Sequence, residues 1–405
     1  RRVLFRSYAR SVCPDLRYVL LAGNGHFDYR GFHSGYKANR IPPFEKEDAT
    51  TDDFFGVLDS GESVRFGTYD MDVAVGRLPL ASVADFNAYN EKVKQYEQTS
   101  KMDNGEWRNS ILLAADDDWT GYSIDEMRHT ENQEEVADML TSRADSSNYR
   151  FDIKKIYLLD YTADAGGQKP EAASDLINKI NQGALFTLYS GHGSMVAWAY
   201  EGLLKSTYIS DISNKGRYTI LGSFSCTVGR FDKGNATSLS ETFIQAPDDG
   251  AIISIGATRE TFSTPNKILE KSILENALFP TGGTIGNAFR MAKGTSLSSY
   301  NEQRYNNERY VLLGEPVISL PDQKLSVSLD QKVDTIQALD NMTLSGSVSG
   351  LSSGTVRLNI LEQSSSKNLT RRTGSGNVNV PVVYDGSPVY SEDVAVENGR
   401  FRANF

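Results

Sequence analysis

The chain has 405 residues, of which 39% are hydrophobic, 23% charged and 10% aromatic, as in an ordinary globular protein of two or three domains. Its net charge of −10 and its pI near 5.1 argue against a surface that binds nucleic acid or anionic membranes. No apolar run approaches the ~18 residues that suggest a membrane span. The first residues hold neither an initiator Met nor a signal peptide, so we expect a fragment excised from a longer protein.

Residues 1–100 predict a first α/β unit. Apolar runs at 16–22 and 72–76 are typical of buried strands, and three- and four-residue spacing of apolar side chains predicts a helix over 82–98. The stretch 23–70 is rich in Gly, Pro, Asp and aromatic residues, which favours a long structured loop over the edge of a site.

Residues 101–322 predict a second α/β unit, in which strands and helices alternate. The expected strands lie at 109–115, 155–159, 187–190, 221–226 and 250–255, with an edge strand and turn at 309–316. The expected helices lie at 123–140, 171–182, 200–212, 238–245, 266–278 and 284–293. Such alternation implies a mostly parallel sheet that is covered by helices on both faces.

The pattern changes after Pro321. Residues 323–405 alternate with period two at 325–329, 342–348, 355–360 and 394–402, and Asn398-Gly399 is a strong signal for a two-residue hairpin. These features predict an antiparallel, immunoglobulin-like β-sandwich that is incomplete here. The polar stretch 364–377 is expected to be a mobile loop of this domain.

Two runs carry the residues of greatest chemical interest. Thr187–Ser194 contains His192 between two glycines, and Leu221–Val228 contains Cys226. Cys226 follows His192 by 34 residues, about the length of one strand–helix–strand unit, so both turns are expected at the carboxyl edge of one sheet. A thiol and an imidazole at that edge would form a nucleophile and its base.

The same edge supplies the other groups that acyl transfer needs. The backbone amides of Gly193 and Cys226 are the expected oxyanion donors. Asp116 follows the strand at 109–115 and is a candidate to orient His192, with Asp117 as the alternative because neighbouring strand residues point to opposite faces.

Simpler interpretations exist for each residue. A lone Cys is often a small core residue, a Gly-His-Gly turn can be only a turn, and residues 116–118 can be a solvated or calcium-binding loop. His129 is expected on the surface of a helix. The four histidines and two cysteines have no zinc-type spacing, so no metal is assigned, although the many aspartates are compatible with a structural calcium ion.

Several motifs resemble the gingipain-type cysteine peptidases. They are Tyr189–Ser194 with Trp198, Ser225-Cys226 after a hydrophobic strand, Thr51–Gly56, Val75–Leu78 and Leu312–Pro316. The resemblance covers roughly residues 15–320 and implies caspase-like α/β sheets, the chain order His then Cys, and Asp116 as the carboxylate that supports the histidine.

The chain also departs from that pattern. It has Ser225 where gingipains have Ala before the nucleophile, and Ser263, within Phe262–Pro265, where they have the tryptophan of the S1 pocket. Their acidic S1 residue falls near His129–Glu131 without a clear match. The resemblance therefore implies relaxed Arg or Lys specificity, with a substrate pocket formed by Trp198, Phe262 and Ser263.

Within the family, other motifs resemble the sortases of the type IX secretion system. These are Ser225–Asp232, Ser238–Glu241, Asn306–Gly314 and Val396–Phe401. The resemblance implies an exported enzyme on the outer-membrane surface of a Bacteroidetes-type bacterium, which needs no cofactor. Its cargo would carry a C-terminal secretion signal, its acceptor would be an amine on lipopolysaccharide or a linker, and an outer-membrane accessory barrel protein would be a partner. The alternatives are a secreted endopeptidase and a non-catalytic surface scaffold.

Overall fold

The computed structural model describes twelve stretches of the chain. They are residues 8–9, 11–46, 48–59, 61–65, 69–102, 105–117, 128–146, 150–279, 283–297, 301–320, 325–331 and 341–405. The predicted helix start at 123–127 lies outside these residues. Among the described helices, none combines the length and the apolar character that crossing a bilayer requires.

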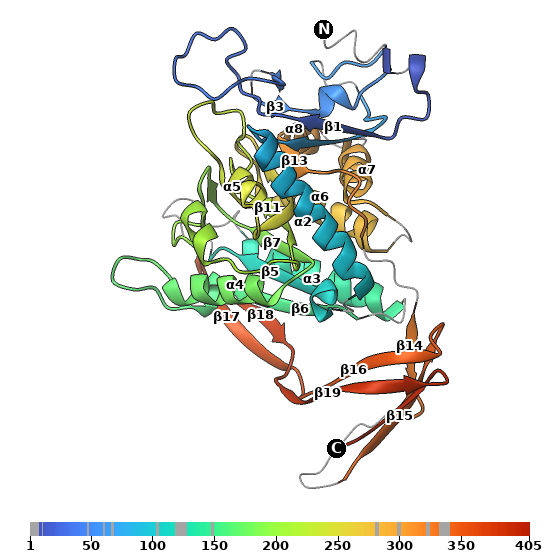
Figure 1. Cartoon of the computed structure of the whole chain (residues 1–405). Coiled ribbons are helices and arrows are strands. Elements are labelled where there is room, and N and C mark those ends of the chain that lie inside the picture. Colours follow the sequence, from blue (N-terminus) through green and yellow to red (C-terminus); the bar gives the residue numbers. More distant parts are fainter. Residues whose placement is uncertain are drawn as a thin grey trace.

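An eight-stranded sheet forms the centre of the molecule, in the order β1-β4-β13-β12-β11-β7-β5-β6 (Figure 1). The strands span Tyr18–Ala22 (β1), Ala74–Leu78 (β4), Ser110–Ala115 (β5), Asp152–Tyr157 (β6), Phe186–Ser190 (β7), Thr219–Phe224 (β11), Ala251–Ala257 (β12) and Tyr310–Gly314 (β13). Neighbours pair in parallel except β12 and β13, which are antiparallel. Every residue of the six strands from β4 to β5 in this order is buried, as expected for strands that are covered on both faces.

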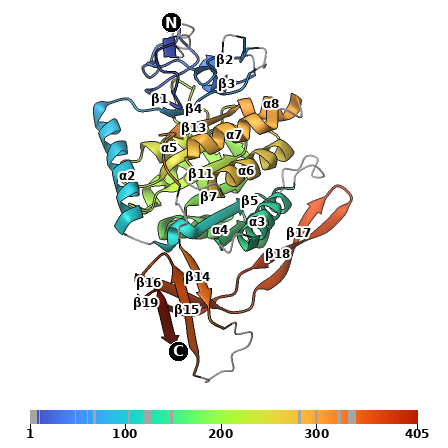
Figure 2. The same cartoon turned by 90° about the vertical axis from the view of Figure 1, so that its right-hand side faces the viewer.

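Helices cover both faces of this sheet (Figure 2). They span Val83–Met102 (α2), His129–Ser146 (α3), Pro170–Gln182 (α4), Leu239–Gln245 (α5), Ser263–Leu278 (α6), Ile285–Leu297 (α7) and Asn301–Glu308 (α8). Helices α2 and α5 contact β12 on one side, whereas α3, α6 and α7 pack together on the other. The predicted α/β class, with a parallel-rich sheet and antiparallel strands after it, is confirmed.

Two elements differ from the predictions. The strand at 309–316 is not at an edge, because β13 lies between β4 and β12. The predicted helix at 200–212 is instead the short strand β10 (Leu204–Lys205) followed by the 3₁₀ helix η4 (Ser206–Asp211). Ala199 and Gly202 have φ angles of 55° and 68°, which an α-helix does not permit.

Buried ion pairs hold the N-terminal loops on the sheet. The Arg77 guanidinium on β4 donates to both carboxylate oxygens of Asp52, at 2.6 and 2.7 Å. Lys293 on α7 donates to Asp53 at 2.6 Å. These residues belong to the motifs Thr51–Gly56 and Val75–Leu78, so those motifs anchor loops. Other short elements here are β2 (Phe44–Glu45), β3 (Thr50–Thr51) and η1 (Asp53–Phe55).

The residues after position 325 form a five-stranded antiparallel sheet, in the order β14-β15-β20-β19-β16. Its strands span Ser326–Leu329 (β14), Thr343–Ser349 (β15), Ser353–Leu361 (β16), Pro388–Glu397 (β19) and Arg400–Asn404 (β20). Asn398 and Gly399 have φ angles of 52° and 75° and join β19 to β20, which confirms the predicted hairpin.

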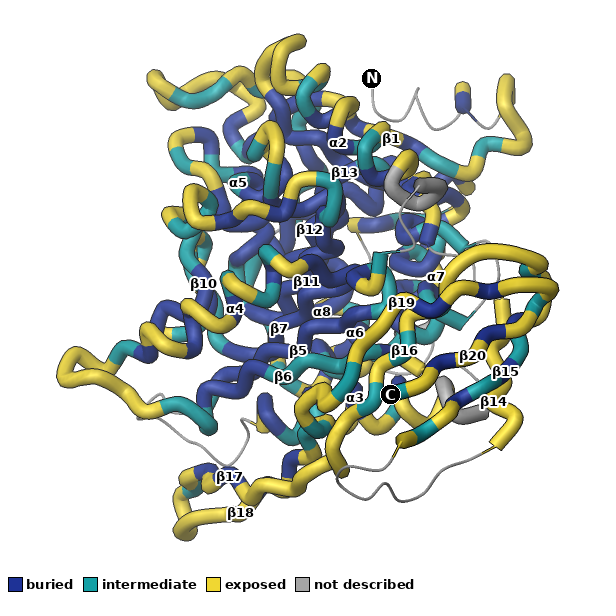
Figure 3. Tube along the Cα trace, turned by 60° about the horizontal axis from the view of Figure 1, so that its bottom comes forward, coloured by how far each residue is buried: buried dark blue, intermediate teal, exposed yellow. Residues whose placement is uncertain are grey.

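The stretch that was expected to be a mobile loop is a long hairpin, which we call the C-terminal hairpin. It consists of β17 (Ser365–Thr373) and β18 (Gly376–Tyr384), and it extends to the α/β domain beside α3 (Figure 2). Leu369, Val380 and Val382 are buried in the same core as the central sheet. The prediction of a loop was wrong because these few inward-facing residues are spread among many polar ones (Figure 3).

Candidate active site

The two chemically important turns lie next to each other. Strands β7 and β11 pair in parallel, with Ser190 opposite Phe224, so His192 and Cys226 each follow their strand by two residues at the same sheet edge. Strand β5 flanks β7 on its other side, with Ala115 opposite Ser190, which places Asp116 beside the His192 turn. The 34-residue spacing therefore reflects neighbouring parallel strands, as predicted.

The Cys226 turn has a strained backbone. Thr227 has a φ angle of 55°, a left-handed conformation that costs a β-branched residue about 1–3 kcal/mol. Hydrogen bonds from Thr227 to Arg259 O (3.2 Å) and from Gly229 to Ala257 O (2.8 Å) hold this turn against the end of β12. The sharp bend lifts Cys226 out of the strand direction and leaves its side chain partly exposed.

The thiol contacts the segment that follows β12. Sγ lies 3.6 Å from Thr261 O and accepts a hydrogen bond from Thr261 N at 3.4 Å. Burial raises the pKa of Cys226 above the ordinary thiol value, and the contacts with Thr261 oppose that rise only in part. The resting group is therefore a neutral thiol that needs a base.

Close packing explains both glycines of the Gly-His-Gly turn. A Cβ at Gly191 would lie 2.6 Å from the Cβ of Asp116, and a Cβ at Gly193 would lie 2.8 Å from Cys226 O. The glycines therefore let the His192 turn touch the Asp116 and Cys226 segments at once.

Asp116 binds the backbone of the His192 turn. Its buried carboxylate accepts hydrogen bonds from the His192 backbone nitrogen at 2.9 Å and from the Tyr189 hydroxyl at 3.1 Å. Burial raises the pKa of Asp116, while His192 lowers it. The alternative, Asp117, instead accepts a hydrogen bond from Lys169 Nζ at 2.8 Å. The geometry thus favours Asp116 as the residue that supports the histidine turn.

The Gly193 amide lies in a short hairpin but is not used to pair its two strands. Gly193–Ser194 (β8) and Ala197–Trp198 (β9) form a small hairpin, and Ala199 N donates to His192 O at 2.9 Å. Hydrogen-bonded and non-hydrogen-bonded pairs alternate in such a ladder, so the Gly193 amide points away from β9. The oxyanion role of Gly193 and Cys226 stays a prediction.

The three residues of the predicted substrate pocket lie at different depths in the structure. Trp198 is fully buried, stacks on Tyr189 with ring centroids 4.5 Å apart, and donates to Ser223 Oγ at 2.9 Å. It therefore supports the β7–β11 pair from inside and does not line a surface pocket. Phe262 is exposed, and Ser263 accepts a hydrogen bond from Asn132 at 2.8 Å, so these two residues remain near the surface.

His129 was expected on the surface and is instead buried beside the candidate site. Its ring meets the His192 ring edge to face, with centroids 5.6 Å apart, and its Nδ1 lies 3.3 Å from Ser190 Oγ. Burial, and then the charge of His192, lower the pKa of His129 to about 3, so it is neutral. In the sequence, a single histidine at the start of a helix has no pattern that indicates a buried place beside His192.

Two groups of carboxylates among the described residues have oxygens close enough to hold a cation. Asp59, Glu62 and Asp72 form a largely exposed group, and Asp116, Asp117 and Glu201 form a more buried one. Burial and the charges of Asp117 and Asp116 raise the pKa of Glu201 to about 7. Lys169 Nζ already supplies a positive charge to the second group, 2.8 Å from Asp117. A structural calcium ion stays a prediction.

Comparison with known proteins decides the family. A profile of peptidase family C25 matches residues 1–321. The chain belongs to peptidase family C25. It is 24% identical to Lys-gingipain W83 of Porphyromonas gingivalis in an alignment of 308 positions, which covers 71% of this chain and 16% of that protein. The chain thus spans about a sixth of the length of this relative.

Solved structures show the same fold. The Arg-specific cysteine proteinase gingipain R (RgpB) matches with a TM-score of 0.62 and 16% identity, over 99% of this chain and 80% of that one. Dimeric latent PorU from Porphyromonas gingivalis matches with a TM-score of 0.39 and 16% identity, over 100% of this chain and 35% of that one. The match to gingipain R confirms a gingipain-like fold for this member of peptidase family C25.

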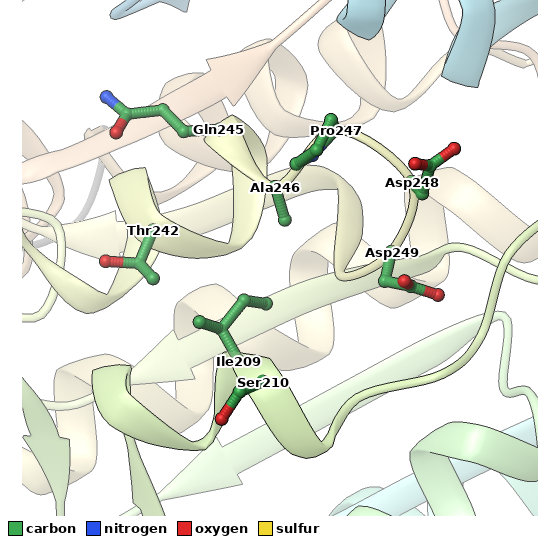
Figure 4. A pocket seen from close by; sticks show the side chains of 8 residues that line it. All are labelled: Ile209, Ser210, Thr242, Gln245, Ala246, Pro247, Asp248 and Asp249. Carbon is green, nitrogen blue, oxygen red and sulfur yellow. The ribbon is translucent and has the colours of Figure 1, made fainter.

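A separate pocket lies away from the candidate active site at the His192 and Cys226 turns. It has a volume of about 400 Å³ and lies between η4 and the end of α5 (Figure 4). Asp248 and Asp249, in the loop that precedes β12, line one side of it. The His192 and Cys226 turns follow their strands, so this pocket lies at the opposite edge of the sheet.

Proposed function

We propose that this chain is the catalytic part of a cysteine sortase, which cuts its cargo by way of a thioester and passes it to an amine. The observation that supports a thiol mechanism is the contact between the His192 and Cys226 turns at Gly193, on neighbouring parallel strands. Membership of peptidase family C25 supports peptide bonds as the substrate.

In the proposed first half-reaction, His192, Cys226 and the backbone amides act in turn. His192 removes the proton of the Cys226 thiol, and the sulfur forms a bond to the carbonyl carbon of the scissile peptide. The amides of Gly193 and Cys226 hold the oxyanion, and collapse breaks the C–N bond. The protonated His192 gives its proton to the departing amine, and a thioester remains on Cys226.

The second half-reaction separates the two candidate activities. An acceptor amine that attacks the thioester carbon forms a new amide and returns the thiol. Water in place of the amine gives a free carboxylate, which is the result of an endopeptidase. Both reactions use the same residues, and exclusion of water from the site favours transfer.

The surroundings of Glu131 favour the sortase over an Arg- or Lys-specific endopeptidase. The acidic S1 residue of gingipains falls near His129–Glu131, and Glu131 is the carboxylate there. Arg371 of the C-terminal hairpin donates to it at 2.8 Å, and both side chains are largely buried. A carboxylate that already pairs with an internal arginine is a poor partner for a basic substrate side chain.

The proposed setting rests on the resemblance of Ser225–Asp232, Ser238–Glu241 and Asn306–Gly314 to the sortases of the type IX secretion system. The cargo would carry a C-terminal secretion signal, and the acceptor amine would belong to lipopolysaccharide or a linker at the outer-membrane surface. An accessory outer-membrane protein would bring cargo to the enzyme. The new amide bond between the cargo and the acceptor amine is the feature of the product that would identify this reaction.

Mass spectrometry of a test cargo tests the proposal. A folded domain that carries a C-terminal secretion signal is incubated with the enzyme and a primary amine such as glycinamide. We expect removal of the signal and a mass increase for an amide with glycinamide. A free carboxylate at every amine concentration would instead show an endopeptidase. Complete processing by the Cys226→Ala variant would rule out both.

A further inference from the structure

The first turn of α3 lies between the candidate active site and the C-terminal hairpin. On one side, the His129 ring packs edge to face on His192, and the Thr130 hydroxyl donates to Asp116 O at 3.4 Å. Asn132 in the same turn donates to Ser263 at 2.8 Å. One helical turn therefore contacts the proposed base, its supporting aspartate segment and a residue of the predicted substrate pocket.

The other side of this turn is attached to the hairpin. Arg371 on β17 is buried, and its Nε donates to Glu131 at 2.8 Å. Arg128 Nε also lies 3.6 Å from a carboxylate oxygen of Glu131, but the Arg128 side chain is mostly exposed. Because Arg371 comes from a different part of the chain, its ion pair fixes α3 relative to the hairpin, which a pair within one helix turn cannot do.

The hairpin is itself held firmly. Leu369 and Val380 lie in the core of the α/β domain, Lys155 donates to Val383 O at 2.7 Å, and Tyr384 donates to Asp160 at 3.0 Å. These contacts give Arg371 a defined position on a hairpin that lies beside α3 (Figure 2). The link runs from Arg371 to Glu131, through the backbone of the first turn of α3 to His129, and from the His129 ring to the His192 ring.

We propose that Arg371 is a positioning residue for the proposed base, and that the C-terminal hairpin sets the His192 ring through the first turn of α3. This inference rests on the proposed function, because it assigns His192 as the base. It gives the C-terminal domain a part in catalysis. Loss of the Arg371 pair lets the turn move away from His192, whereas the Cys226 turn, held by β12, stays in place.

The test compares Arg371→Gln with Lys367→Ala. Lys367 lies on the same strand and pairs with Asp160 on η3 (Leu158–Asp160) instead of α3. A peptidyl acyloxymethyl ketone, whose labelling of Cys226 needs the histidine, is the first probe, and iodoacetamide, which needs only the thiol, is the second. Both are used in a Cys13→Ser background.

We expect Arg371→Gln to slow ketone labelling about 10- to 100-fold, as a misplaced catalytic group does, and to leave iodoacetamide alkylation within about 2-fold. Lys367→Ala should leave both rates unchanged, and Arg371→Lys should recover part of the loss. Glu131→Gln combined with Arg371→Gln should be no slower than either single variant. Ketone labelling of Arg371→Gln at the wild-type rate would overturn the inference.

Hydrogen exchange separates this inference from the proposed function. In Arg371→Gln, amides of residues 128–133 and 190–196 should exchange faster than in Lys367→Ala. If the wild type is never labelled by the ketone but this exchange pattern appears, the mechanical link stands and the proposed catalysis fails. If the ketone labels the wild type and amide exchange is the same in both variants, Arg371 does not position the His192 turn. The proposed catalysis then stands.

Discussion

A methyl group on Gly193 would lie 2.8 Å from the carbonyl oxygen of Cys226 and 2.6 Å from Ser225 Oγ. The His192 and Cys226 turns therefore touch through their backbones, and no larger residue fits between them. This contact holds the turn of the proposed base against the turn of the proposed nucleophile.

Gly193→Ala should separate these two turns. Because displacement of catalytic groups by about 1 Å can cost 10²-fold in rate, we expect labelling by the acyloxymethyl ketone to fall on the order of 10²-fold. Gly294→Ala on α7 is the control, since a Cβ there has no atom within 4 Å. Equal labelling rates in the two variants would show that the turns are not held at a critical distance.

The reactivity of Cys226 should depend on pH in a defined way. Burial raises its pKa, so the thiolate fraction should still be rising above the ordinary thiol pKa of ~8.5. We expect the rate of iodoacetamide alkylation in a Cys13→Ser background to keep increasing beyond that pH. A rate that is already constant at neutral pH would show instead that Cys226 rests as a thiolate paired with a protonated His192.

Glu270 on α6 should make stability depend on pH. Burial raises its pKa to about 8 from 4.5, so the folded state keeps a proton that the unfolded state has lost. The free energy of unfolding should thus fall as pH rises between these values, by up to ~1.4 kcal/mol per pH unit from this group.

Glu270→Gln removes this pH dependence and should retain the hydrogen bond from Gln133, now at 2.8 Å. Its melting temperature should exceed that of the wild type increasingly from pH 5 to pH 8. Glu275→Gln, on the same helix but exposed in its pair with Arg143, is the control and should show little change. A constant difference across this range would contradict the raised pKa.

Arg77 should be essential for the attachment of the N-terminal loops. Arg77→Met leaves Asp52 buried without its charge partner, which typically costs about 3–5 kcal/mol. Arg143→Met breaks an exposed pair with Glu275 and should cost less than about 1 kcal/mol. Urea unfolding of both variants measures the difference, and equal midpoints would refute it.

The sequence predicted the parts of the site that depend on neighbouring strands. The spacing of His192 and Cys226 indicated adjacent parallel strands because about 30 residues suffice for one crossover between such strands. The crossover itself holds β8, β9, β10 and η4 in place of the expected α-helix. Asp116 was predictable for the same reason, since it directly follows β5.

Contacts between distant segments could not be predicted in this way. His129 meets Ser190 and His192 through tertiary packing, and an isolated histidine at a helix start has no pattern that reveals it. Arg371 lies in a polar stretch whose inward-facing residues are too sparse to indicate a buried hairpin. The place of β13 inside the sheet depends on strand order, which periodicity does not encode.

Strand β13 has a consequence for how the chain is made. Strands β1 and β4 are translated before the other strands of the central sheet, yet β13, which pairs with β4, is built from residues 310–314. The nascent chain must therefore carry two unsatisfied apolar sheet edges, on β4 and on β12, until that late segment leaves the ribosome. Protection of these edges during synthesis, by a chaperone or by rapid elongation, then becomes a requirement for the yield of folded protein.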